Sequence, residues 1–293
     1  MKNPKHRFGD RNDGVWLRDV DSMHKLFPYM MPNRTDNEAV VNEIIDLTAV
    51  NEYIKKKNAE NPSFKYTFFH VIVAAIMKTM VLRPKLNRFY CAKRLYQRDS
   101  FSVSFVVKKT FEDKSEEALA IIKVDPESEV SPIEQIHSKV ETICNSVRKE
   151  HKKDGSTNDM DVVAKLPRPI IKLLMRVLSL LDYFGLYPKA LMKDDPYYCS
   201  AFVSNLGSIK MNASYHHIAN WGTNSFFAVV GEKKPTAFYS SDGSYYVHDA
   251  LELSITLDER IADGYYYSKS ILLCKKLLEN PELLELPIST PVE

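Results

Sequence analysis

The sequence predicts an α+β protein in which helices cover a mixed sheet. Three observations lead to this prediction: segments in which apolar and polar residues alternate, segments that are apolar at helical spacing, and turn signals between them. The alternating segments are expected to pair as strands. Strands grouped with two or three long helices are typical of a sandwich of sheet and flanking helices.

The composition is that of a protein with a substantial core and no strong electrostatic preference. The chain has 293 residues, of which 44% are hydrophobic, and shows no internal repeat, so we expect a single domain over residues 1–293. Its net charge of +2 favours neither nucleic acid nor an anionic membrane. No apolar run approaches the ~20 residues that span a bilayer, so no transmembrane segment is expected.

The cysteine spacing and the first residues of the sequence indicate the cellular compartment. The four cysteines are widely spaced and form no Cys-x-x-Cys pair, which argues against a zinc site or a disulfide framework and suits a reducing cytosol. Residues 1–14 are polar and charged, without the apolar core of a secretory signal. We therefore expect a cytoplasmic protein.

Seven segments are expected to form strands, because their residues alternate or because a short apolar run lies between turn signals. A hairpin turn is expected at Asp242-Gly243, between the last two strands. The expected strands are 40–47, 101–107, 118–125, 201–203, 225–230, 236–240 and 244–257.

Helices are expected where apolar residues recur at helical spacing or where a cap is recognisable. Segment 67–83 is apolar almost all round and stops at a proline, so we expect a buried helix with His70 packed inside it. Ser131–Glu134 forms a capping box with proline at the first helical position, which predicts a helix to about residue 152. Thr48 is expected to cap a short helix, and Asp263 the final one.

Another helix, over 169–184, is apolar around most of its circumference. Such a helix normally buries itself in the core or in a subunit interface. A role at a membrane surface or in binding an acyl chain is an alternative, although two cations give little attraction to anionic lipid.

The last strand leads into an acidic turn, residues 258–264, which reads Asp-Glu-Arg-Ile-Ala-Asp-Gly. This turn resembles the signature of the 2-oxoacid dehydrogenase acyltransferase (E2) catalytic domains and of the chloramphenicol acetyltransferases. Both families carry a histidine, three further residues and then Asp-Gly. Asp258, Arg260, Asp263 and Gly264 fit the E2 pattern, whereas Glu259 stands where the families have their catalytic histidine.

Further segments carry the resemblance, in the right order, over about residues 15 to 280. The E2-like segments are Ser204-Asn205-Leu206-Gly207-Ser208-Ile209, Ala228-Val229-Val230-Gly231 and Pro84-Lys85-Leu86-Asn87. Trp16-Leu17-Arg18 is similar to a Trp-x-Arg near the start of the chloramphenicol acetyltransferases.

The resemblance implies a chloramphenicol acetyltransferase-like fold, a homotrimer with its active channel between subunits, and acyl transfer from coenzyme A. Segment 155–196 is longer and more apolar than its counterpart in the family, so we expect an apolar helical insertion there. No lipoyl or subunit-binding domain with its Ala/Pro-rich linkers is recognised in the sequence.

The resemblance also implies roles for single residues. Ser204 matches the serine that donates a hydrogen bond to the tetrahedral oxyanion; the alternative is a serine at a strand end that satisfies a local backbone group. Arg18 and Asp263 match residues that form an ion pair. With Arg260 and Gly264, they are expected to be architectural, Asp263 also as a helix N-cap.

Glu259 has two interpretations. In the families the histidine takes the proton of a thiol, whose pKa is about 2 higher, at a cost of about 2.7 kcal/mol. The pKa of an ordinary glutamate is ~4 below that of the thiol, so the same proton transfer costs about 5.7 kcal/mol unless burial raises the glutamate pKa. Glu259 is therefore either a general base retuned by burial or a structural carboxylate among arginines.

His216-His217 offers another base. Adjacent residues on a strand point to opposite faces, so at most one of the two can face the channel, and a metal site that uses both is disfavoured. Either could replace the missing histidine, and the alternative is a structural polar residue.

Two functions follow from these observations. The first is a coenzyme A-dependent acyltransferase that passes an acyl group between a thioester and a small-molecule acceptor. The second is a catalytically silent trimeric scaffold, or a protein of the same fold that binds coenzyme A or another ligand. Neither function requires a metal or nucleic acid.

Overall fold

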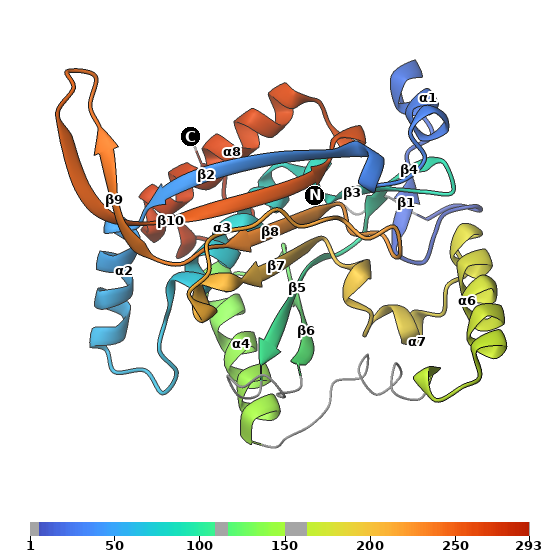
Figure 1. Cartoon of the computed structure of the whole chain (residues 1–293), viewed down its shortest axis with the longest axis horizontal. Helices are drawn as coiled ribbons and strands as arrows, with labels where there is room; N and C mark the ends of the chain where they lie inside the picture. The colour runs from blue at the N-terminus through green and yellow to red at the C-terminus, as the bar shows by residue number, and fades with distance from the viewer. Residues whose placement is uncertain (1–5, 109–116, 150–162, 293) are drawn as a thin grey trace.

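The structure, a computed structural model, describes residues 6–108, 117–149 and 163–292 (Figure 1). Within these residues the fold is α+β, as predicted, with one large mixed sheet and one small antiparallel sheet. The large sheet has the order β2 (Glu38–Asp46), β10 (Tyr245–Asp258), β8 (Phe226–Val230), β7 (Ala201–Asn205), β5 (Phe101–Lys108) and β6 (Glu117–Val124), with β9 (Lys234–Tyr239) paired to β10. The small sheet has the order β1 (Gly14–Trp16), β4 (Arg94–Arg98) and β3 (Arg88–Cys91).

The centre of the large sheet is parallel and its flanks are antiparallel. Strand β7 runs parallel to both β5 and β8, whereas β10 is antiparallel to β8 and β2. The sheet is therefore mixed. Strand β7, whose last residues include Ser204, lies between β5 and β8.

Helices cover one face of this sheet, as Figure 1 shows for α3, α4 and α8. The main core lies between these helices and the inward side chains of the strands, and a smaller apolar cluster around Phe202 and Phe227 lies apart from it. The helices are α1 (Ser22–Met30), α2 (Thr48–Ala59), α3 (Phe68–Leu82), α4 (Pro132–Lys149), α6 (Arg168–Tyr183), α7 (Lys189–Met192) and α8 (Gly264–Glu279).

Helix α3 is the buried helix that the sequence predicts. All its residues from His70 to Val81 are buried, and it ends just before Pro84, whose ring cannot continue a helix. Its first turn is held by Thr67, whose backbone N–H donates to Nδ1 of His70 at 3.0 Å. A histidine therefore takes the place that glutamate or glutamine has in a capping box.

Two expected caps are wrong. Neither half of the expected capping box forms: Ser131 Oγ has no hydrogen-bond partner among the described residues, and the Glu134 carboxylate accepts from Lys57 and Tyr66 instead of from the backbone at Ser131. At α2 the roles are reversed: the carboxylate of Asp46 accepts from both the N–H and the hydroxyl of Thr48. A charged acceptor next to the helix start displaces the weaker hydroxyl.

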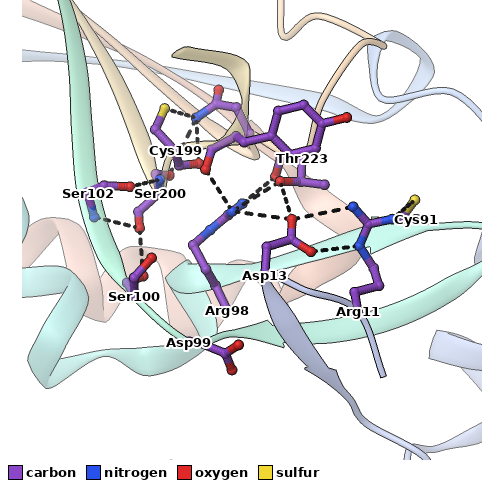
Figure 2. A network of polar contacts seen from close by, with 12 residues as sticks. Arg11, Asp13, Cys91, Arg98, Asp99, Ser100, Ser102, Cys199, Ser200 and Thr223 are labelled. Atoms are coloured by element: carbon purple, nitrogen blue, oxygen red, sulfur yellow. Dashed lines mark hydrogen bonds and ion pairs between the residues drawn. The ribbon is translucent and has the colours of Figure 1, made fainter. Parts of the chain in front are cut away.

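A buried ionic network joins the small sheet to the large one (Figure 2). Asp13 lies between two arginines: Arg11 donates to it at 2.8 Å, and Arg98 lies 4.0 Å from it. The hydroxyl of Thr223 donates to Asp13 and accepts from Arg98. These side chains are almost completely buried, so the network fixes the N-terminal segment against the turn before β8.

Candidate functional site

A cavity of about 500 Å³ lies where β5 and β7 end beside the start of α3. It collects polar groups from several segments on a wall that also includes aromatic and aliphatic side chains. The polar residues in its lining include Thr67, His70, Ser204, Asn205, Ser208 and His216. Two of the residues expected from the sequence, Ser204 and His216, therefore meet in one cavity.

Ser204 is the next-to-last residue of β7 and is half-buried. Its hydroxyl forms no hydrogen bond to any residue that the structure describes, which leaves it available to a ligand. The turn after it, Leu206–Ile209, is held close to the neighbouring backbone, because a Cβ on Gly207 would lie 2.4 Å from the carbonyl oxygen of Gly231. The matching glycines of the two E2-like segments are thus in direct contact.

The ring of His216 is stacked on Phe227 of β8, with the centroids 4.0 Å apart and the planes within 3°. Its Nδ1 lies 3.2 Å from the carbonyl oxygen of His217. Because a carbonyl only accepts, this contact places the proton on Nδ1 and leaves a lone pair on Nε2. A neutral imidazole held in this way has the form that a general base requires.

His217 does not line the cavity. Its Nδ1 lies 2.8 Å from the carboxylate of Glu38, and its side chain is 85% exposed. Only one of the two histidines lines the cavity, although residues 211–219 are not a strand as the sequence reasoning assumed.

Glu259 lies outside this cavity in the chain as described. It is exposed, at the start of a short 3-10 turn, and its carboxylate forms no hydrogen bond or ion pair with any described residue. The adjacent Asp258 and Arg260 are buried and bind each other through two contacts of 2.8 and 2.7 Å. Neither environment expected for Glu259 is found in the described chain: its side chain is not buried, and Arg260 binds Asp258 instead.

The expected ion pair between Arg18 and Asp263 is wrong within this chain. Arg18 pairs with Asp10 at 2.9 Å and lies over the ring of Trp16. Asp263 caps α8, as predicted, by accepting from the N–H of Tyr266, and this hydrogen bond lowers the pKa of its carboxyl. The Arg18 guanidinium and the Asp263 carboxylate are thus each bound by a residue nearby in the sequence and do not pair with each other. Gly264, the first residue of α8, has no atom within 4 Å of where a Cβ would stand.

Sequence reasoning missed two polar groups of the cavity. His70 was expected only to be a packed residue of the buried helix, and Asn205 was part of an E2-like motif but had no expected role of its own. His70 Nε2 and Asn205 Oδ1 are both buried and have no hydrogen-bond partner among the described residues. The spacing Thr-x-x-His before an apolar helix was the available signal for His70, because it has the form of a capping box.

Thiol nucleophiles are disfavoured at three of the four cysteines. Burial raises the pKa of Cys91 to about 12 and that of Cys274 to about 11, and it also raises the pKa of Cys199. These thiols stay protonated at neutral pH. All four cysteines are free of disulfides.

Helix α6 is not part of the core of this chain. None of its residues is buried, and Leu173 and Leu180 are 64% and 59% exposed. The 16 residues of this helix are the longest helical stretch in the described part of the expected insertion 155–196; residues 155–162 lie outside the described ranges.

Neither a membrane-spanning helix nor a cluster of metal ligands is found among the described residues. No helix in the described parts of the chain is long and apolar enough to cross a membrane. Among the same residues, no group of three or more His, Cys, Asp or Glu side chains could hold a metal ion.

No family model and no curated protein sequence matches this chain. Solved structures do match it. A probable dihydrolipoamide acetyltransferase from Listeria monocytogenes is 15% identical, with a TM-score of 0.57 over 89% of this chain and 93% of that one. For the dihydrolipoamide acetyltransferase of Azotobacter vinelandii, the identity is 14% and the TM-score 0.57, over 93% and 95% of the two chains.

A chloramphenicol acetyltransferase is 10% identical, with a TM-score of 0.52 over 89% of this chain and 95% of that one. The likeness thus extends over nearly the whole length of all three structures. The chain has the fold shared by the dihydrolipoamide acetyltransferases and chloramphenicol acetyltransferase, as the motifs predicted.

Proposed function

We propose that the protein transfers an acyl group between a coenzyme A thioester and a small-molecule acceptor in the Ser204 cavity. The observation that carries this proposal is that one cavity of about 500 Å³ is lined by a serine hydroxyl and a histidine Nε2 that have no hydrogen-bond partner among the described residues. The fold supports it, because its solved relatives include acetyltransferases.

His216 is the proposed general base. Its Nε2 takes the proton of the acceptor, a thiol, hydroxyl or amine, as the acceptor attacks the carbonyl carbon of the thioester. In general, an imidazole takes the proton of a thiol at a cost of about 2.7 kcal/mol, against about 5.7 kcal/mol for a carboxylate of ordinary pKa. When the tetrahedral intermediate collapses, the C–S bond breaks and the same proton passes from His216 to the departing thiolate of coenzyme A.

Ser204 is the proposed oxyanion donor. As the new bond forms, the carbonyl oxygen becomes negative, and the Ser204 hydroxyl donates to it. One such donor contributes about 2.7–4 kcal/mol to the transition state in other enzymes. The proposed mechanism needs no metal and no covalent enzyme intermediate.

The proposed assembly is a homotrimer with the channel between subunits. In that arrangement Glu259, which is exposed in the single chain, would be free to approach the cavity of a neighbouring subunit. Glu259 then competes with His216 for the role of base, and substitutions separate the two.

The experiment measures release of coenzyme A from acetyl-CoA with dihydrolipoamide and with a panel of amine and hydroxyl acceptors. We expect kcat to fall about 10²-fold or more for Ser204→Ala and for His216→Asn. His217→Asn is the matched control and should retain full activity. If Glu259→Gln abolishes turnover while His216→Asn does not, the base is Glu259.

A second candidate is a silent protein that binds coenzyme A without turning it over. The observation that favours it is the exposed Glu259, free of hydrogen bonds to described residues, where the families have their catalytic histidine. Calorimetry decides between the candidates: binding of coenzyme A with no transfer to any acceptor supports the silent protein. Absence of binding at millimolar coenzyme A contradicts both.

A further inference from the structure

The contacts of His70 define which of its ring nitrogens carries the proton. Its Nδ1 accepts from the backbone N–H of Thr67 at 3.0 Å, so this nitrogen carries no proton in the neutral ring. Burial, with a smaller effect from nearby His137, lowers the pKa of His70 to about 4. At neutral pH the ring is therefore uncharged, and its one proton is on Nε2.

The Nε2–H of His70 is a donor that nothing in the described chain satisfies. His70 is 2% exposed, and its Nε2 has no hydrogen-bond partner among the described residues. An unsatisfied buried donor costs about 1–3 kcal/mol, and a ligand that supplies an acceptor removes this cost. His70 belongs to the lining of the Ser204 cavity, where a ligand can do so.

The same cavity contains an acceptor in the same condition. Asn205, next to Ser204 at the end of β7, has a buried Oδ1 with no partner in the described part of the chain. One buried donor and one buried acceptor match the two polar atoms of a secondary amide, which has an oxygen to accept and an N–H to donate. A thioester offers no N–H and would leave Asn205 unsatisfied.

We propose that His70 and Asn205 bind an amide group in the pantetheine arm of coenzyme A, with the Nε2–H of His70 donating to the amide oxygen and Asn205 Oδ1 accepting from the amide N–H. This inference rests on the proposed function, because it assigns coenzyme A to the Ser204 cavity. Its consequence is that the arm, and not only the nucleotide, is recognised by polar contacts.

The test uses two substitutions of His70 that separate its role as acceptor for the Thr67 N–H from its role as donor to the ligand. Asparagine places its oxygen near the position of Nδ1, so His70→Asn keeps the acceptor for Thr67 and loses the Nε2 donor. Glutamine places its amide near the position of Nε2, so His70→Gln keeps a donor and loses the cap. Thermal unfolding of both variants establishes that they are folded.

Calorimetry then measures the affinity of the full chain for three probes: coenzyme A, pantetheine, and adenosine 3′,5′-bisphosphate, which lacks the arm. We expect His70→Asn and Asn205→Ala to bind coenzyme A and pantetheine about tenfold more weakly, with no change for the bisphosphate. His70→Gln should stay within about threefold of the wild type for all three probes.

Unchanged affinity of His70→Asn for pantetheine, or equal weakening for all three probes, would overturn this inference and leave the proposed function standing. If the wild type binds none of the probes at millimolar concentration, both fall together. If the expected pattern is found in a protein that transfers no acyl group, the amide site stands and acyl transfer is lost.

Discussion

Asp13 holds two buried arginines, Arg11 and Arg98, whose side chains are each only 2% exposed (Figure 2). Arg11 has a second carboxylate partner in Asp182, whereas the other contacts of Arg98 are to Thr223 and a backbone carbonyl. Removing the charge of Asp13 therefore leaves the Arg98 guanidinium buried without a carboxylate partner among the residues that the structure describes.

We expect Asp13→Asn to lower the free energy of unfolding by about 3 kcal/mol, measured by urea denaturation. Asp99→Asn is the control, because Asp99 is 25% exposed and its partner His6 is 48% exposed. Its effect should stay below about 1 kcal/mol. Equal effects of the two substitutions would show that the buried network does not stabilise the fold.

His70 makes stability depend on pH in a defined window. Its folded-state pKa is lowered to about 4, chiefly by burial, whereas an unfolded histidine takes up its proton near about 6.5. Between these values the unfolded chain binds more protons, so stability is full above about pH 6.5 and falls as the pH drops toward 4.

The lowered pKa of His70 corresponds to a loss of about 3 kcal/mol in the free energy of unfolding between these pH values. Solvent screening is small, because this side chain is only 2% exposed. Urea unfolding at pH 7 and pH 4.5 measures it, and His70→Asn should flatten this part of the profile. A variant profile identical to that of the wild type would mean that His70 is protonated in the folded state.

The positions of some single residues could be predicted from the sequence and others could not. The position of Ser204 at the end of a strand was predicted, because its motif follows a strand whose register is fixed by neighbours on both sides. The Arg18–Asp263 pair was predicted wrongly, since Asp10 lies closer along the chain and takes the arginine. The state of His70 Nε2, buried and without a partner in the described parts of the chain, depends on contacts from several segments, which no local pattern encodes.

The turn after β7 shows which glycine the fold requires. A Cβ on Gly207 would lie 2.4 Å from the carbonyl oxygen of Gly231, so backbone would have to move. Gly264 has no atom within 4 Å of its Cβ position, and it begins α8. The two glycines come from equally convincing motifs but differ in their steric surroundings.

We expect Gly207→Ala to lower the free energy of unfolding by about 1–3 kcal/mol and to weaken ligand binding in the adjacent cavity. Gly264→Ala should be neutral or stabilising by up to about 1 kcal/mol, because alanine is the better helix former. Thermal unfolding of the two variants side by side checks the pair. The steric argument fails if Gly264→Ala is the more damaging change.

Elements with strong periodicity were predicted well, and short strands were missed. Helix α3 is long and apolar, so its pattern alone indicates burial. Strands β1, β3 and β4 have 3, 4 and 5 residues, and β4 reads Arg-Leu-Tyr-Gln-Arg. Too few alternations occur in such strands to signal a sheet, and the ionic network that fixes them joins residues far apart in the sequence.

The whole molecule leaves part of its apolar surface uncovered. Leu173, Val177 and Leu180 of α6 are all well exposed and recur at a spacing that aligns them along one side of the helix. Soluble monomers rarely expose large continuous apolar patches. This surface supports an assembly of several chains, as the proposed trimer requires.

Sedimentation equilibrium should give the mass of three chains, each of 33.7 kDa. The reason is that the proposed channel lies between subunits, so an active protein has to be assembled. Dilution below the assembly range should reduce activity together with the mass. A species with the mass of one chain that retains full acyl transfer would contradict the trimer.

The most direct test of acyl transfer in the Ser204 cavity compares two neighbouring histidines. His216 lines the same cavity as Ser204, and His217 binds Glu38 outside it. In the acetyl-CoA assay, kcat should fall about 10²-fold or more for His216→Asn and stay unchanged for His217→Asn. Full activity of His216→Asn, or no turnover by the wild type with any acceptor, would contradict the proposed chemistry.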